Sequence, residues 1–129
     1  MTSDFSKYIV VGFIDETIST LANCNYIGQV YAAPGVIKHI KKRHNHELNE
    51  SILNDIIDTI KKVLNEPEYI GTHPKKIGTS IEFIKEIDNN ILVATELDIK
   101  ENYIYVASMY PIHQSKIDNR IHSGRLKKL

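Results

Sequence analysis

The sequence predicts an α+β protein in which N-terminal helices pack on one face of a roughly four-stranded antiparallel sheet, followed by a short C-terminal helix. Three observations predict this class. Apolar residues recur with helical spacing up to about residue 64, and from about residue 79 they recur with a period of two. The chain has 129 residues, of which 42% are hydrophobic, and this suits a single domain over residues 1–129 with its own core.

The first half of the chain reads as two strands and two helices. Residues 8–14 (YIVVGFI) form a short run rich in β-branched residues, which predicts a buried strand. A helical turn is predicted over 16–22 and a second strand over 26–31. Pro34 stands where a helix start tolerates proline, and the spacing of the apolar residues then predicts a helix over 36–44.

The longest periodic segment predicts a helix over 49–64. Asn49 is a suitable N-cap, and Pro67 prevents continuation. One side of this helix is apolar, formed by Ile52, Leu53, Ile56, Ile57, Ile60, Val63 and Leu64.

The second half predicts strands at 79–87, 91–98 and 102–110, joined by turns at 88–90 and 100–102. Ile117 and Ile121, four residues apart, predict a final helix, and Gly124 is suited to a left-handed C-terminal cap. Such a meander, covered by helices on one face, leaves the other face available for a ligand.

The net charge of zero hides an uneven distribution. The chain has 16 basic and 16 acidic residues. Residues 36–46 carry a net charge of +4 and residues 113–129 carry +4, whereas 1–35 carry −2 and 47–112 carry −6. Two basic segments on an acidic body suit a phosphate-bearing partner if the fold brings them together, and are otherwise solvated helix faces.

The composition also predicts the cellular location. Cys24 is the single cysteine, so no internal disulfide is expected, and this fits a reducing compartment. The apolar run within residues 1–14 is too short for a signal peptide, and no segment has the length of a membrane span. We therefore expect a cytoplasmic protein without membrane contact.

The helix at 36–44 carries the first candidate site residues. His44 follows the buried side of the helix at its C-terminus, where the helix dipole favours a protonated imidazole. His39 and Arg43 form a neighbouring i, i+4 pair suited to binding a phosphate. The alternative is that His44 only caps the last carbonyl groups.

Alternation in the strand at 79–87 separates Glu82 from Lys85. Lys85 shares a side with Ile81 and Phe83, whereas Glu82 points the other way, so both can face one site only with a bulge or an edge position. Lys85 either extends to water along an apolar face or is held for function.

In the last strand, the same alternation predicts that Ser108 and Tyr110 lie on the side of Ile104 and Val106. Tyr103, Tyr105 and Met109 are then predicted on the opposite side. Tyrosines on one strand face can stack on bases, although in β-rich chains they more often pack.

Metal and cofactor chemistry is not expected. His39, His44 and His46 cluster, but their spacing matches no zinc signature, and the basic residues among them would repel a cation. The chain contains no Gly-rich phosphate loop and no nucleophile elbow.

Four short motifs occur in order: Lys-Arg-His at 42–44, Pro-Glu-Tyr-Ile-Gly at 67–71, Ser-Ile-Glu-Phe-Ile-Lys-Glu at 80–86 and Gly-Arg-Leu-Lys at 124–127. With these motifs the chain resembles the phage-associated branch of the barnase, EndoU, colicin and RelE like (BECR) nucleases, from about Tyr8 to Lys128. The resemblance implies helices packed on a four-stranded antiparallel sheet and a metal-independent, toxin-like endoribonuclease. It also implies an RNA substrate, no cofactor, and an antitoxin or immunity protein as a partner.

The matching positions supply the site residues. The resemblance implies catalytic roles for His44, Glu82, Lys85 and Ser108, and substrate-binding roles for Arg43, Tyr110 and Arg125, to which we add His39 beside Arg43. We hypothesise that His44 and Glu82 are the acid and base, in an unassigned order. In this hypothesis Arg43, Lys85 and Arg125 bind phosphate, and Ser108 and Tyr110 orient it.

Two alternatives stay open at this stage. The chain departs from the family pattern at Ala107, where many members carry a basic residue before the small hydroxyl residue. A catalytically weak or inactive, nuclease-derived module that binds RNA or a protein is therefore the main alternative. A regulatory domain without a nucleic-acid role is the other, and it predicts an exposed apolar patch.

Overall fold

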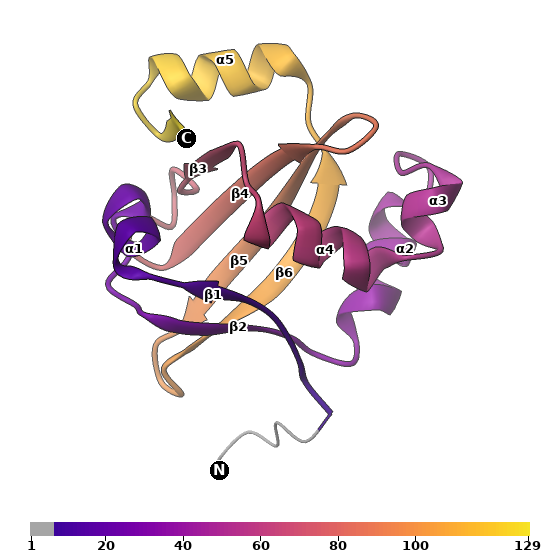
Figure 1. Cartoon of the computed structure of the whole chain (residues 1–129), viewed down its shortest axis with the longest axis horizontal. Coiled ribbons are helices and arrows are strands. Elements are labelled where there is room, and N and C mark those ends of the chain that lie inside the picture. The colour runs from indigo at the N-terminus through magenta and orange to yellow at the C-terminus, as the bar shows by residue number, and fades with distance from the viewer. Residues whose placement is uncertain (1–6) are drawn as a thin grey trace.

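A computed structural model describes residues 7–129 (Figure 1). Residues 1–6, which belong to the predicted domain and to the segment assessed for a signal peptide, lie outside the described residues. In chain order the elements are β1 (Ile9–Ile14), α1 (Glu16–Ala22), β2 (Gly28–Ala32), α2 (Val36–His44), α3 (Glu50–Leu53), α4 (Ile56–Asn65), β3 (Tyr69–Gly71), β4 (Ser80–Glu86), β5 (Asn90–Asp98), β6 (Tyr103–Pro111), α5 (Gln114–His122) and β7 (Leu126–Lys128).

The α+β class is confirmed, but the predicted four-stranded antiparallel sheet is wrong in detail. The strands form one seven-stranded mixed sheet in the order β1-β2-β6-β5-β4-β3-β7. β2 runs parallel to β6, and the other neighbouring pairs are antiparallel. β3 and β7 have three residues each, which is too short for an alternating pattern to be recognised in the sequence.

The predicted helix over 49–64 is divided into α3 and α4. Asn49 caps α3 as predicted, since its Oδ1 accepts a hydrogen bond from the backbone N–H of Ile52 at 2.9 Å. Asp55 then leaves the helical region, with φ −147° and ψ 50°, before α4 begins. Asn and Asp favour such breaks because their short side chains compete for backbone hydrogen bonds.

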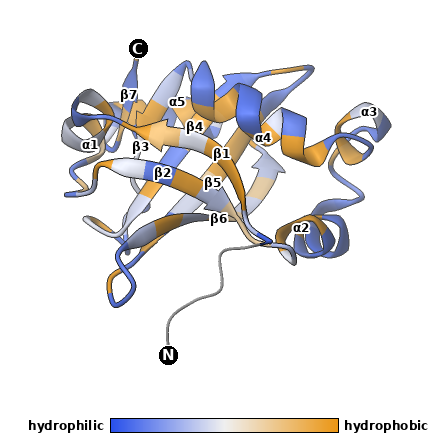
Figure 2. Cartoon of the chain, turned by 60° about the horizontal axis from the view of Figure 1, so that its bottom comes forward, coloured by the Kyte–Doolittle hydropathy of each residue, from blue (hydrophilic) through white to orange (hydrophobic). Residues whose placement is uncertain are grey.

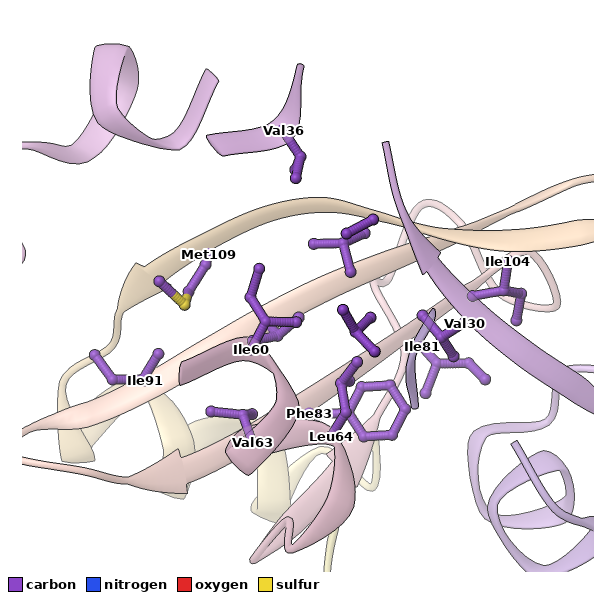
Figure 3. Packing of buried hydrophobic residues seen from close by; sticks show 14 of the residues in the cluster. Val30, Val36, Ile60, Val63, Leu64, Ile81, Phe83, Ile91, Ile104 and Met109 are labelled. Atoms are coloured by element: carbon purple, nitrogen blue, oxygen red, sulfur yellow. The ribbon is translucent and has the colours of Figure 1, made fainter. Parts of the chain in front are cut away.

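The main core lies between α4 and the sheet face that carries Ile81, Phe83 and Val93, which we call the α4 face. Figure 2 shows α4 turning its apolar side to the sheet and its polar side outward. Ile60, Val63 and Leu64 from α4 meet Phe83 in this core, as Figure 3 shows. α1 and α2 contribute Ala22, Val36 and Ile40 to the same core. This packing fixes the strands on which the site residues stand.

The opposite side of the sheet, which carries Glu82, Ile84, Leu92 and Tyr110, is called the α5 face. α5 and β7 cover one part of it, where Ile117 and Leu126 pack on Ile84 and Leu92 in a second, smaller core. The sequence predicted that this face is left available, and this is wrong for the part that α5 covers. Gly124 follows α5 with φ 82°, the left-handed cap that the sequence predicted.

A β-bulge in β6 reverses the predicted placement of two site residues. Ala94 pairs with Ser108 and Thr95 with Val106, so Ala107 is an extra residue in β6. Because the extra residue shifts the alternation, Ser108 and Tyr110 lie on the α5 face, while Met109 joins Ile104 and Val106 in the main core. The simple period of two is therefore wrong for this strand.

The helices between residues 7 and 129 do not include one that is long and apolar enough to cross a membrane.

Candidate active site

A buried ion pair joins β4 to α5. Glu82 lies on the α5 face with only 2% of its surface exposed. Nη1 of Arg120 donates a hydrogen bond to Oε1 of Glu82 at 2.6 Å, and the Arg120 side chain is 17% exposed. An arginine has five N–H donors in a planar fork, so this bond fixes the guanidinium while other donors stay available to a ligand.

Tyr110 stands beside this ion pair. The side chain is partly buried against the smaller core. Desolvation raises the pKa of the phenol, and the neighbouring Glu82 carboxylate raises it further, while the Arg120 charge partly offsets both. Tyr110 therefore keeps its proton at neutral pH and acts as a hydrogen-bond donor in the site.

His44 reaches the same place from the end of α2. β2 pairs with β6 at Ile104 and Tyr105, and α2, which follows β2 in the chain, lies beside β6. The His44 and Tyr110 rings pack together with 5.2 Å between their centroids and 33° between their planes. Nδ1 of His44 lies 2.8 Å from Oε1 of Glu47. Because an ionised carboxylate only accepts hydrogen bonds, this contact places a proton on Nδ1, and in the neutral imidazole Nε2 is then the acceptor.

Part of this group borders an open cleft of about 890 Å³. Tyr110, Arg120 and Glu47 line it, together with the first residues of α5 and the β4–β5 turn, which contribute Lys116, Glu86, Asp88 and Asn90 among others. The cleft thus combines a fixed guanidinium, a phenol donor and, next to Tyr110 and Glu47, an imidazole with a free acceptor nitrogen. This set can bind a phosphate group and transfer protons at it.

Four of the residues expected from the sequence lie together in space. Glu82 binds Arg120, Tyr110 lies beside both, His44 packs on Tyr110, and Ser108 stands on the same strand face at the bulge. The Ser108 Oγ is buried and has no hydrogen-bond partner among residues 7–129. A buried hydroxyl without a partner is a donor for which a bound group would provide the acceptor.

Lys85 lies apart from this group. It stands on the α4 face, and its Nζ is 3.8 Å from Oε2 of Glu66 at the end of α4. Lys85 and Glu82 could face one site only if their strand contained a bulge or lay at an edge. The pairing of β4 with β5 has no bulge, and the bulge near the site lies in β6. Lys85 therefore acts as a surface cation that pairs with Glu66.

The other basic candidates are dispersed. His39 and Arg43 are exposed on α2; Arg43 directly precedes His44, and His39 lies five residues before it. Arg125 lies just before β7, where its Nε donates to the Ser123 Oγ at 3.2 Å. Lys127 and Lys128 are exposed on the edge strand β7. Lysines at a sheet edge protect it against unwanted pairing.

Arg120 and Glu47 are site residues that the sequence reasoning missed. Arg120 belongs to the basic C-terminal segment, but no local pattern distinguishes it from Lys116 or Arg125. A carboxylate three residues after His44, at a spacing that brings side chains together at a helix end, was an available signal for Glu47.

Comparison with known proteins identifies the family. Searches find no match among curated proteins and none among solved structures. One family model, described as phage-Barnase-EndoU-ColicinE5/D-RelE like nuclease3, matches residues 8–119. The matched range holds His44, Glu82, Ser108 and Tyr110, and it ends one residue before Arg120. With most of its length matched, the chain belongs to the phage-Barnase-EndoU-ColicinE5/D-RelE like nuclease family.

Proposed function

We propose that the chain is an endoribonuclease that cleaves RNA through attack of a 2′-hydroxyl group on the neighbouring phosphodiester. One observation carries this proposal: Tyr110 and Arg120 line one cleft, His44 packs on the Tyr110 ring, and Glu82 holds Arg120, so that four separate elements contribute. Membership of a nuclease family supports the reaction class.

His44 is the general base of this proposal. Its Nδ1 is held by Glu47, so Nε2 accepts the proton of the attacking 2′-hydroxyl. The 2′-oxygen then forms a bond to phosphorus, and the bond from phosphorus to the 5′-oxygen breaks. The products are a 2′,3′-cyclic phosphate and a free 5′-hydroxyl.

Arg120 and Tyr110 complete the reaction. The guanidinium faces the negative charge that builds on the phosphorane, and it is worth most when fixed beforehand. Tyr110 is protonated at neutral pH, since burial raises its pKa above an ordinary value that is already about 10, and it donates a proton to the leaving 5′-oxygen. Side chains thus supply both proton transfers, and the proposed reaction does not require a metal.

Glu82 takes a different role from the one first hypothesised. With 3% of its side chain exposed and Arg120 bound to it, Glu82 is out of reach of an RNA proton. We assign it as a positioning residue that holds Arg120. Lys85 and Arg125 are not part of the proposed site, whereas Arg43 and His39 extend its basic surface along α2.

The proposed biological role follows from the family. We propose that the enzyme acts in the cytoplasm of a bacterial cell, as a toxin carried by the host or by a phage, and that an antitoxin or immunity protein neutralises it. Expression of the wild-type chain is then expected to arrest growth, and the His44→Ala variant is expected not to.

The decisive experiment is digestion of a single-stranded RNA in the presence of EDTA. We expect fragments with 2′,3′-cyclic phosphate and 5′-hydroxyl ends, and no cleavage of a DNA of the same sequence. His44→Ala is expected to lower kcat by about 10²–10⁴-fold, with Lys85→Ala as the matched control. Intact RNA at all enzyme concentrations, with and without divalent ions, would contradict the proposal.

A binding module without activity is the second candidate. The acidic residues Glu47, Glu86 and Asp88 in the cleft lining favour the form of this module that binds a protein, because they weaken the attraction of the cleft for a polyanion. RNA that binds in a salt-dependent manner and is never cut would instead support the form that binds RNA.

A further inference from the structure

A cluster of tyrosines lies on the α5 face where β1, β2 and β6 run side by side (Figure 1). Tyr8, Tyr31 and Tyr103 form three mutual contacts with ring centroids 6.1–6.5 Å apart and ring planes inclined by 64–72°. Tyr105 joins them through Tyr103 at 5.8 Å. All four side chains are partly exposed.

The cluster lies on the strand face that leads into the cleft. Tyr103, Tyr105, Ser108 and Tyr110 follow one another on the α5 face of β6, because the bulge at Ala107 keeps the last two on this side. At about 3.3 Å per strand residue, the five residue steps from Tyr105 to Tyr110 span about 16 Å along β6. This is a separation that a short run of nucleotides spans.

Helices pack on other parts of the sheet. α1 and α4 join the main core on the opposite face. α5 packs on Ile84 in β4 and Leu92 in β5, whereas the tyrosines lie on β2, on β6 and just before β1. The cluster is bordered by Val10 and Phe13, which are 43% and 54% exposed on the edge strand β1.

We propose that Tyr8, Tyr31, Tyr103 and Tyr105 form a stacking surface for unpaired bases of the RNA, so that single-stranded RNA is the substrate class. This inference rests on the proposed function, since it extends the same substrate beyond the cleft. Aromatic rings bind successive bases of single strands by stacking, with little dependence on sequence. In a duplex the bases stack on one another and their faces are not available.

The charges around Tyr105 determine how RNA binding at the tyrosines should depend on salt. Glu96 and Asp98 lie beside Tyr105, and Nζ of Lys76 binds Oε1 of Glu96 at 2.8 Å. These carboxylates do not attract phosphate, so the affinity at the tyrosines comes from ring contact and is insensitive to salt. The salt dependence of binding instead comes from basic residues such as Arg43 and Arg120.

The test separates binding from cleavage. The probe is a dye-labelled single-stranded RNA of about ten nucleotides, 2′-O-methylated at every position so that no 2′-hydroxyl can attack. Its duplex with the complementary strand is the second probe. Affinity is measured by fluorescence anisotropy, and stacking by quenching of intrinsic fluorescence, which comes from the seven tyrosines because the chain has no tryptophan.

The variants are Tyr103→Leu and Tyr105→Leu, with the phenylalanine substitutions as conservative versions. We expect each leucine variant to bind the single strand about tenfold more weakly or worse. The loss should be the same factor at about 50 and about 200 mM salt. Phenylalanine should restore affinity, and duplex affinity should not change. Tyr69→Leu is the matched control, a partly buried tyrosine on β3 that packs on the smaller core.

Tyr8→Leu is a further variant that is expected to fold normally, because Tyr8 precedes β1 and is not part of that strand. Wild-type affinity in the leucine variants, or an equal loss with phenylalanine, would overturn the stacking surface. The same holds if the patch binds a protein and RNA causes no quenching. Binding that depends on the tyrosines, without cleavage of natural RNA, would support the stacking surface and contradict the nuclease proposal. Cleavage of natural RNA by an enzyme whose tyrosine variants bind normally would support the nuclease proposal and contradict the stacking surface.

Discussion

The guanidinium of Arg120 on α5 donates a 2.6 Å hydrogen bond to the buried carboxylate of Glu82 on β4. This bond connects two residues that are 38 positions apart in the chain. It explains how a carboxylate that is 2% exposed is tolerated on the α5 face, since a buried charge needs a partner. It also holds a cation at the wall of the cleft.

Arg120→Ala is expected to destabilise the protein by about 3–5 kcal/mol, because it leaves Glu82 buried and unpaired. The double variant Glu82→Leu/Arg120→Met should recover much of this loss, since apolar residues replace both charges. Urea unfolding measures both. In RNA cleavage the double variant should remain inactive, and recovery of activity would contradict a role for Arg120 at the phosphate.

Glu47→Ala is expected to lower kcat by about tenfold or more while KM changes little, because the His44 ring loses the contact that fixes its tautomer. Glu47→Gln should lose less, since its amide oxygen still accepts from Nδ1. The measurement is steady-state cleavage of a labelled RNA. An equal change in KM would indicate that Glu47 acts on binding instead.

Stability is expected to fall as the pH rises above about 10, the ordinary pKa of tyrosine. The pKa of Tyr110 is raised by burial first and then by Glu82, so the folded state holds the phenol proton more tightly than the unfolded state. Above that pH the unfolded chain releases protons that the folded chain keeps, which favours unfolding. Urea midpoints between about pH 8 and 11 should show a smaller decline in Tyr110→Phe.

Lys85→Ala is expected to leave RNA cleavage unchanged and to cost at most about 1 kcal/mol, because its partner Glu66 is a surface carboxylate. This prediction opposes the role that the family motif suggests for Lys85. A loss of activity comparable with that of His44→Ala, in a variant that unfolds like the wild type, would place the site on the α4 face.

Gly71→Ala is expected to reduce both stability and activity. A Cβ at Gly71 would lie 2.3 Å from the backbone oxygen of Arg125, so β7 would have to move away from β3. Because β7 anchors the end of α5, Arg120 would lose its position over Glu82. Thermal unfolding and cleavage should decline together, whereas Gly35→Ala, where a Cβ meets nothing within 4 Å, is the control.

Much of the fold could be predicted because it depends on local patterns. The bounds of the helix over 36–44 agree with α2, and the three strands of the second half lie within one residue of β4, β5 and β6. The opposite orientation of Glu82 and Lys85 also followed from alternation alone. The strands β3 and β7 could not be predicted, since three residues bury too little to produce a pattern and their pairing joins segments far apart in the chain.

The candidate site could be predicted only in part, for the same reason. The motifs indicated His44, Glu82, Ser108 and Tyr110, but the face on which Ser108 and Tyr110 lie depends on the bulge at Ala107, which only pairing with β5 reveals. In the sequence, nothing distinguishes Arg120 from the other basic residues of its segment. Its role depends on the packing of α5 against β4, which brings it to Glu82.

The sequence by itself determined the α+β class, the secondary structure of the long elements and the resemblance to the nuclease family, because periodicity and motifs are properties of neighbouring residues. The tertiary structure decided which charges meet. Of the two basic segments, each with a net charge of +4, only the C-terminal one contributes lysine or arginine side chains, Lys116 and Arg120, to the lining of the cleft. Arg120 pairs with the buried Glu82 close to Tyr110, on which His44 packs. A partly buried, fixed cation interacts more strongly with a nearby negative charge than several solvated cations do.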